Sequence, residues 1–116
     1  MSRPSKVRIG YRSYSVQTLP QSFKDTTEAN GASDADDLLI QIGEWLDEDR
    51  AREILLHETL HQILELTGFT DKPPDGDLEL SADLEEQLCK RVTPVLLDVL
   101  RRNPRLIDYL LARDGA

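Results

Sequence analysis

Residues 70–77 divide the second half of the chain into two helical segments. They read Thr-Asp-Lys-Pro-Pro-Asp-Gly-Asp, and two prolines followed by a glycine cannot continue a helix. Before this stretch, apolar residues recur at spacings of three and four from Ala51 onward, and Gly68 is a good C-terminal stop. After it, a second helix is expected from about Ser81 to Arg102. Because the apolar residues are concentrated in these two segments, most of the core is expected to be helical.

Other local signals place the remaining helix boundaries. Residues 47–50 read Asp-Glu-Asp-Arg, and the three acidic side chains favour the positive end of a helix dipole, so the first helix is expected to begin there. Pro94 falls inside the second helix and is expected to kink it or divide it. Asn103 followed by Pro104 predicts a cap and a first helical position, which would begin a final short helix that ends near Ala112.

The first half of the chain predicts a small sheet. Residues 6–19 alternate between apolar and polar side chains, which indicates a strand or a hairpin around residues 10–13. Residues 20–37 are expected to be loop, and a second short strand is expected at 38–42. Strands followed by helices predict an α+β fold, with a small antiparallel N-terminal sheet packed on the helices. A single domain over residues 1–116 is expected, with its core at about 36–102 and a C-terminal helix within 103–116.

Charge and composition narrow the classes of partner. The 116 residues carry a net charge of −8, whereas a nucleic-acid-binding protein normally presents a basic patch to the phosphates. Direct nucleic-acid binding is therefore not expected. The chain has one cysteine, Cys89, which suits a reducing compartment, and it has no apolar run long enough to cross a membrane. A cytoplasmic protein without a membrane partner is expected.

Residues 57–61 read His-Glu-Thr-Leu-His, and His57 and His61 are the only histidines in the chain. Helical positions four apart lie on one face, so both imidazoles can reach one metal ion. Neutral imidazole is a good zinc ligand, and Glu58, rotated by about 100° around the helix, can lie beside the ion as a general base. The pattern predicts one zinc ion with Glu58 as the catalytic residue. The alternative is a His/Glu cluster on an exposed helix face that holds no metal.

A catalytic zinc site also needs a third protein ligand and one position open to water. Without a third histidine, the ligand is expected to be a carboxylate at the start of the second helix, where Glu85 and Glu86 lie. Glu85 precedes residues of the apolar stripe by three, four and seven positions, whereas Glu86 is followed four positions later by Lys90. Glu85 is therefore the preferred third ligand, and Glu86 is its rival. For both, an ordinary acidic residue in a first helical turn is the simpler alternative.

The His-Glu-x-x-His segment, a short loop and Leu84-Glu85-Glu86 on a second helix resemble the minimal gluzincins of phage and prophage. Those proteins are similar to the ImmA/IrrE metallopeptidases. The resemblance covers roughly residues 36–100 and implies a minimal zincin-like arrangement, in which a small sheet packs on the helix that carries the zinc motif. The chain lacks the Glu-Ala-Asn-x-Phe sequence of ImmA-type proteins and has no helix-turn-helix segment. Their role in repressor cleavage is therefore not carried over.

The expected activity is hydrolysis of peptide bonds by a zinc endopeptidase acting on a protein or peptide. Zinc would polarise the carbonyl and acidify a water molecule, and Glu58 would pass a proton from that water to the leaving amine. Tyr11, Tyr14 and Tyr109 are candidates for a further oxyanion donor, although packing is the simpler role for each. The alternative is a non-catalytic zinc-containing binding protein, such as a phage-type adaptor or inhibitor, that keeps the helix pair as a structural element.

Overall fold

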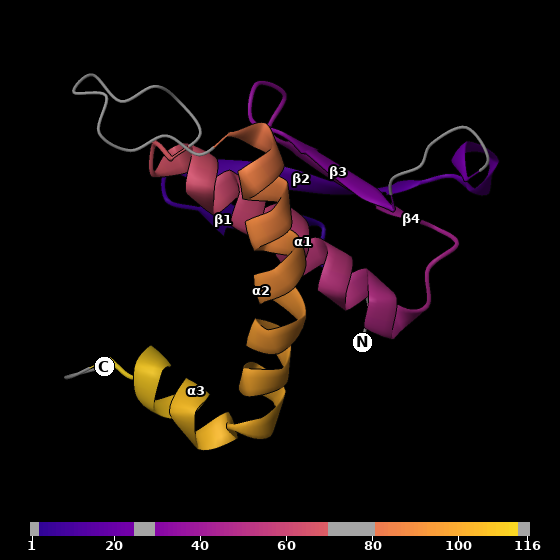
Figure 1. Ribbon diagram of the computed structural model, residues 1–116. Coiled ribbons are helices and arrows are strands. Elements are labelled where there is room, and N and C mark those ends of the chain that lie inside the picture. The colour runs from indigo at the N-terminus through magenta and orange to yellow at the C-terminus, as the bar shows by residue number, and fades with distance from the viewer. Residues whose placement is uncertain (1–2, 25–29, 70–80, 114–116) are drawn as a thin grey trace.

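The computed structural model describes residues 3–24, 30–69 and 81–113, in which four strands and three α-helices form an α+β fold (Figure 1). The strands form one sheet, helix α1 packs on one face of it, and helix α2 packs on α1. A short 3₁₀ helix, η1 (Gln21–Phe23), follows the second strand. The expected α+β class is confirmed. The loop expected at 70–77 lies outside the described residues.

The first two strands form a hairpin. β1 (Lys6–Ile9) pairs antiparallel with β2 (Arg12–Leu19), and Ile9 pairs with Arg12 across a two-residue turn. Gly10 begins this turn with a φ of 59°, a left-handed conformation that glycine adopts at little cost. The hairpin predicted around residues 10–13 is confirmed.

The rest of the sheet corrects two expectations. β4 (Leu39–Gly43) pairs in parallel with β2 and antiparallel with β3 (Gly31–Asp34), which gives the strand order β1-β2-β4-β3. The sheet is therefore mixed and not antiparallel. The prediction of a loop over 20–37 is wrong at residues 31–34, where β3 forms the edge of the sheet.

Side-chain composition explains the positions of these two strands. β4 reads Leu-Ile-Gln-Ile-Gly and carries the buried residues Ile40 and Ile42, so it occupies an interior position with a strand on either side. β3 reads Gly-Ala-Ser-Asp and covers little of the core. An edge strand of this kind lacks the apolar alternation by which strands are recognised in a sequence.

Helix α1 (Glu48–Leu66) begins and ends at the expected signals. Asp47 is its N-cap, and the Asp47 Oδ1 atom accepts a hydrogen bond of 2.8 Å from the backbone N–H of Arg50. The helix ends at Leu66, and Gly68 follows with a φ of 86°, in the left-handed region typical of helix C-termini. Both predicted boundaries of this helix are confirmed.

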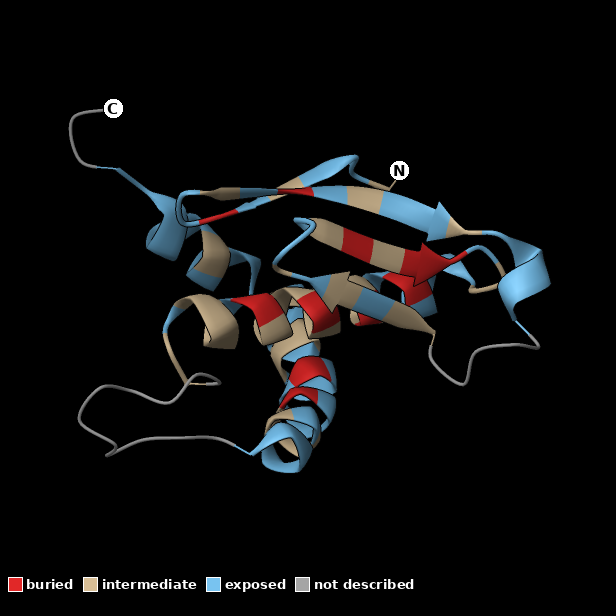
Figure 2. Cartoon of the chain, turned by 90° about the horizontal axis from the view of Figure 1, so that it is seen from above, coloured by how far each residue is buried: buried red, intermediate tan, exposed pale blue. Residues whose placement is uncertain are grey.

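The core lies between the sheet and α1, and Figure 2 shows buried residues on β4 and along this helix. The buried apolar residues are Ile9, Tyr14, Ile40, Ile42, Ala51 and Ile54. A Cβ atom on Gly31 would lie only 2.5 Å from Ile54 Cγ2 and 2.8 Å from the backbone oxygen of Gln41. Glycine at this position therefore lets the edge strand β3 approach α1 closely.

Helix α2 (Ala82–Arg102) packs against α1 and continues through Pro94 as one helix. The proline therefore does not divide it. Ser81 caps its start, because the Ser81 Oγ atom accepts a hydrogen bond of 3.1 Å from the backbone N–H of Leu84. Helix α3 (Pro104–Leu111) follows, with Pro104 at its first position as expected. Within residues 3–24, 30–69 and 81–113, no helix is both long and apolar enough to cross a membrane.

A buried polar network connects α1 to two strands. The fully buried Tyr14 of β2 donates a hydrogen bond of 2.7 Å from its hydroxyl group to Gln62 Oε1. Gln62 Nε2 in turn donates a hydrogen bond of 2.8 Å to Ser33 Oγ of β3. Three residues after Gln62 on the same helix, the carboxylate of Glu65 forms an ion pair with Arg12 of β2. Since a buried amide is costly unless its hydrogen bonds are made, this network fixes the rotation of α1 relative to the sheet.

We expect Tyr14→Phe to lower the free energy of unfolding by about 1–3 kcal/mol, because it removes the hydroxyl donor and leaves the buried Gln62 oxygen without that partner. The matched control is Tyr11→Phe at the exposed turn, for which a change within about 0.5 kcal/mol is expected. Urea denaturation followed by circular dichroism measures both. Equal losses in the two variants would contradict a specific role for the network.

Candidate metal centre

His57 and His61 lie one helical turn apart on the side of α1 that faces α2. Their Nε2 atoms are 3.2 Å apart, and the ring centroids are 4.8 Å apart. Both side chains are largely covered by the surrounding structure. The structure therefore brings together the two imidazoles, as the four-residue spacing on a helix predicts.

Glu86, in the second turn of α2, faces both imidazoles. Its Oε1 atom lies 3.1 Å from His57 Nε2, and its Oε2 atom lies 2.9 Å from His61 Nε2. In the described part of the chain, these three residues are the only group of His, Cys, Asp and Glu side chains whose ligand atoms lie close enough together to hold a metal ion.

Glu85 contacts the opposite side of the His61 ring. Its Oε1 atom lies 2.7 Å from His61 Nδ1 and accepts the hydrogen bond that this ring nitrogen donates. The Glu85 side chain is 15% exposed and that of Glu86 is 52% exposed, so the prediction that Glu85 lies on the buried side of α2 is confirmed. The more buried carboxylate, that of Glu85, nevertheless contacts His61 Nδ1, whereas the more exposed carboxylate, that of Glu86, contacts the Nε2 atoms of both histidines.

This arrangement places three acceptors around one point. A neutral His61 that donates its Nδ1 proton to Glu85 keeps a lone pair on Nε2, and the Glu86 carboxylate can only accept. The two Nε2 atoms lie 3.2 Å apart, each lies 2.9–3.1 Å from a different Glu86 oxygen, and one ligand atom from each of the three residues lies within 4.8 Å of the other two. These acceptors repel one another unless a proton or a cation lies among them. Ligands that bind tetrahedral zinc at 2.0–2.1 Å lie about 3.3 Å apart. The separation of the two Nε2 atoms and the donor types are therefore compatible with a single ion held by these three residues.

Glu58 lies beside the cluster and not in it. Its side chain is buried, with 8% of the residue exposed, and it does not belong to the group of metal-binding atoms. Across residues 3–24, 30–69 and 81–113, no hydrogen bond or ion pair involves its carboxylate. In the described residues no buried side-chain oxygen lacks a hydrogen-bond partner, so the Glu58 oxygens retain access to solvent, and Glu58 lines two hollows. Its position next to the three acceptors is suited to contact with a bound water molecule or substrate.

Two hollows meet at this position. One has a volume of about 440 Å³ and extends between α1 and α2 toward Arg50 and Lys90. The other has a volume of about 480 Å³ and extends along β3 toward Asp34 and Glu65. Gly31, Glu58 and Glu86 line both hollows, so the two carboxylates are accessible from either side.

The edge strand β3 is the part of the site that sequence reasoning missed. Gly31 begins this strand, and a Cβ atom there would be 3.7 Å from Glu58 Cγ, which places the strand against the helical turn that bears the expected base. The only signal in the sequence is Asn30-Gly31, a pair that indicates a turn as readily as a close approach of two segments.

The surroundings of His61 raise its pKa. Burial of the ring acts to lower the pKa, but the hydrogen bond to Glu85 and the charges of Glu58, Glu86 and Glu85 favour the protonated ring and outweigh the burial. The same carboxylates would favour a cation held at the ring nitrogens. The electrostatic field of the site is therefore suited to a positively charged ligand.

Cys89 and the three tyrosines lie outside this chemistry. Burial, followed by the charges of Glu85, Glu86 and Glu58, raises the pKa of the Cys89 thiol to about 12, so Cys89 is a neutral, packed side chain at physiological pH. Tyr14 hydrogen-bonds within the core, and neither it nor Tyr11 nor Tyr109 lines the two hollows beside Glu58. None of these tyrosines is therefore positioned as an oxyanion donor.

The chain was compared with protein-family models, with curated proteins and with solved structures, and no match was found in any of the three comparisons. The resemblance to gluzincins therefore stays a prediction that depends on the zinc motif and the second helix. The function has to be inferred from the geometry of the site itself.

In metal-free protein, we expect the pKa of His61 to lie above the ordinary value of 6.5, and Glu85→Gln to lower it by removing the carboxylate at Nδ1. Titration of the ring protons of the two histidines by nuclear magnetic resonance measures this directly.

A group whose pKa is higher in the folded state stabilises the fold at pH values below its unfolded pKa. That stabilisation is lost as the pH rises through the folded pKa. Glu85→Gln should therefore lower the stability of the metal-free protein more at pH 5.5 than at pH 8. An unchanged His61 titration in the variant would contradict this assignment of Glu85.

Proposed function

We propose that this chain is a zinc-dependent peptidase that hydrolyses peptide bonds in a protein or peptide substrate. The observation that carries the proposal is the convergence of His57, His61 and Glu86: the two Nε2 atoms lie 3.2 Å apart, and each lies 2.9–3.1 Å from one oxygen of the Glu86 carboxylate. Two imidazoles and one carboxylate suit zinc better than calcium or magnesium, which prefer oxygen ligands.

We assign Glu86 as the third ligand. The distances favour it over Glu85, which the sequence analysis preferred. Only Glu86 has oxygen atoms beside both Nε2 atoms. Glu85 is engaged at His61 Nδ1, at 2.7 Å. A carboxylate in that position fixes the ring orientation and the tautomer of a histidine ligand and raises its basicity. Glu85 is therefore a positioning residue in this proposal.

The number of donors favours a catalytic site over a purely structural one. Structural zinc sites are closed by four protein ligands, whereas catalytic sites have three and leave one position for water. Three donors converge in the part of the chain that the structure describes. The thiol of Cys89 is kept neutral by its surroundings, whereas zinc binds the thiolate form.

Glu58 is the residue that we propose as general base. When bound, zinc supplies polarisation of the substrate carbonyl and increased acidity of a water molecule. The Glu58 carboxylate lies beside the three donors, borders both hollows and is free of ion pairs within the described residues. It can therefore accept the proton of the attacking water and donate that proton to the leaving amine.

The shape of the site supports a substrate that extends to both sides of the reacting bond. The two hollows, of about 440 Å³ and about 480 Å³, adjoin each other at Gly31, Glu58 and Glu86, which line both. Each is within the size range of ordinary ligand-binding pockets. A chain that occupies both would cross Glu58 in the middle, as an endopeptidase requires.

We expect purified protein to bind one zinc ion per chain, and Glu86→Ala and His57→Ala to lose it. Glu85→Ala is the matched comparison, since it removes an adjacent carboxylate from the same helix. It should retain zinc, with an affinity reduced roughly 10–100-fold, because it removes only the partner of a ligand. Elemental analysis after desalting and competition with a chelator measure both quantities. Loss of zinc in Glu85→Ala with retention in Glu86→Ala would reverse the assignment of the third ligand.

In the zinc-loaded protein, we expect Glu58→Gln to retain the metal and to slow peptide hydrolysis by about 10²–10⁴-fold, because the amide cannot act as a base. The probe is a mixture of unstructured peptides of known sequence, whose cleavage products are identified by mass spectrometry. Glu48→Gln, which alters a half-exposed carboxylate of the same helix outside both hollows, is the control and should hydrolyse peptides at the wild-type rate.

Either of two outcomes contradicts the enzymatic reading. Hydrolysis at the wild-type rate by Glu58→Gln would exclude Glu58 as the base. One zinc per chain without any hydrolysis by the wild-type protein would favour the alternative of a zinc-containing binding protein.

A further inference from the structure

The two hollows at the metal centre lie end to end along α1. On this helix the first hollow is bordered by residues from Arg50 to Glu58, and the second by residues from Glu58 to Glu65. At a rise of about 1.5 Å per residue, the helix spans about 22 Å between Arg50 and Glu65. An extended peptide of about seven residues has the same length. The two hollows together therefore have the length of a peptide that crosses Glu58.

The charges that line the two hollows differ. Glu58 and Glu86 are common to both. The first hollow has in addition two basic side chains and one carboxylate, those of Arg50, Lys90 and Glu53. The second has no lysine or arginine among the described residues that line it, and it has three further carboxylates, those of Asp34, Glu65 and Glu85. A peptide that lies along α1 therefore passes from a region of mixed charge into a region of negative charge.

Ion pairs inside the fold compensate part of this charge. Arg50 pairs with Glu53 in the first hollow, and Glu65 of the second hollow pairs with Arg12 of β2. Lys90 forms no ion pair or hydrogen bond within the described residues. The first hollow therefore keeps one uncompensated positive charge besides the two carboxylates that it shares with the second.

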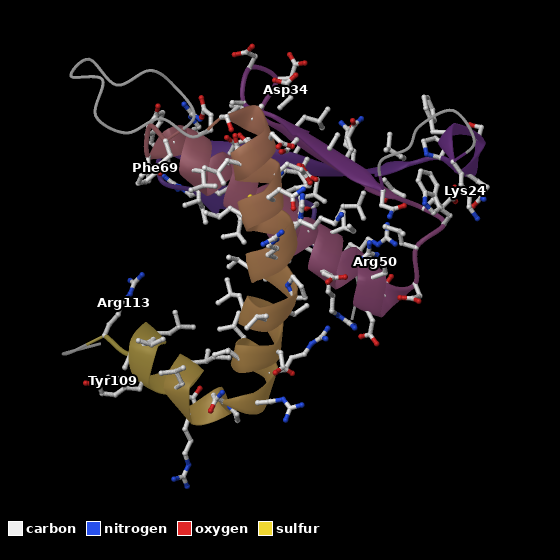
Figure 3. The ribbon with its side chains drawn as sticks, viewed as in Figure 1. Lys24, Asp34, Arg50, Phe69, Tyr109 and Arg113 are labelled. Atoms are coloured by element: carbon white, nitrogen blue, oxygen red, sulfur yellow. The ribbon has the colours of Figure 1, made fainter. Side chains whose placement is uncertain are left out.

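Asp34 supplies an accessible negative charge to the second hollow. It is the last residue of β3, and its Oδ1 atom accepts hydrogen bonds of 2.8 Å and 3.3 Å from the backbone N–H groups of Asp36 and Asp37. These bonds hold the carboxylate in place, while its Oδ2 atom has no partner in the part of the chain that the structure describes. Figure 3 shows Asp34 beside the N-terminal end of α2, well apart from Arg50 on the first turn of α1.

Glu58 indicates that the second hollow is built to hold a ligand. The residue is only 8% exposed and lines the hollow, yet its carboxylate has no hydrogen bond or ion pair within the described residues. A buried polar group without a partner in the fold is normally satisfied by a ligand or by water. The hollow is also concave, and a concave site lined by one sign of charge concentrates the electrostatic field that acts on a ligand. A positively charged group is the ligand that this field favours.

We propose that the site is selective for basic peptides, with a lysine or arginine side chain of the substrate in the second hollow and Asp34 as the specificity-determining residue. This inference rests on the proposed peptidase function, because it names the substrate class of the same site. An ammonium or guanidinium group can donate to the free Asp34 oxygen, whereas an acidic side chain is repelled there. The second hollow extends along α1 from Glu58 to Glu65, about 10 Å. The basic residue therefore lies within about three residues of the cleaved bond, on one side of it.

Peptide binding tests this selectivity without requiring hydrolysis. The probes are three fluorescent, end-capped peptides of about eight residues that share one neutral sequence and carry lysine, glutamine or glutamate at the same central position. In zinc-loaded Glu58→Gln, in which peptides stay intact, fluorescence anisotropy should give the lysine peptide a dissociation constant about 10-fold below that of the glutamine peptide. The glutamate peptide should bind most weakly.

Asp34→Asn in the same background should lower the preference for lysine over glutamine by about 3–5-fold. The amide keeps the acceptor oxygen of the turn but loses the charge, so the fold is preserved. The matched control is Asp36→Asn, which removes a charge from the same turn at a residue that lines neither hollow, and it should keep the full preference. A preference that Asp34→Asn leaves unchanged, or that Asp36→Asn lowers equally, would overturn the proposal.

Cleavage of a peptide mixture by the wild-type protein is the second readout. Lysine and arginine should be enriched at a fixed position on one side of the cleaved bonds, and the enrichment should fall in Asp34→Asn. Hydrolysis combined with equal binding of the lysine and glutamine peptides would overturn the selectivity and leave the peptidase function intact. A lysine preference that Asp34→Asn lowers, in a protein that hydrolyses no peptide, would support the selectivity of the hollow and contradict the proposed function.

Discussion

The contact of α1 with elements on both of its sides is the constraint on which the rest of the structure depends. On one side, Ile54 and Gln62 pack against the sheet, and on the other side, His57 and His61 meet the carboxylates of α2. Glu58 lies between these two surfaces. The Tyr14–Gln62–Ser33 hydrogen bonds fix the rotation of the helix, and a change of that rotation would move both histidines and the expected base together. The stability of the fold and the geometry of the site thus depend on the same helix.

The helices were predictable because their boundaries are determined locally. Asp47, Ser81 and Pro104 act within a few residues of their own positions, and the structure has helices that begin there. The parallel pairing of β2 with β4 was not predictable, since it depends on the distant contact that places the apolar β4 in the interior. The edge strand β3 was missed because its Gly-Ala-Ser-Asp sequence carries no periodicity.

The histidine pair was predictable from helical spacing alone, but the roles of the two glutamates were not. The sequence indicates correctly that Glu85 is the less exposed of the two. Burial, however, does not specify which nitrogen of His61 a carboxylate meets. Adjacent positions on a helix differ by about 100°, so Glu85 and Glu86 reach opposite edges of one imidazole ring. Only the distance and the crossing of the two helices determine this, and neither is encoded by local spacing.

The covered position of Cys89 has a practical consequence. Its thiol is fully buried on α2, one turn from Glu85, and its raised pKa leaves almost no thiolate at neutral pH. An alkylating reagent can therefore react with it only when α2 separates locally from its neighbours. As Cys89 is the only cysteine in the chain, the rate of its modification is a built-in reporter of how often the two halves of the histidine–carboxylate cluster come apart.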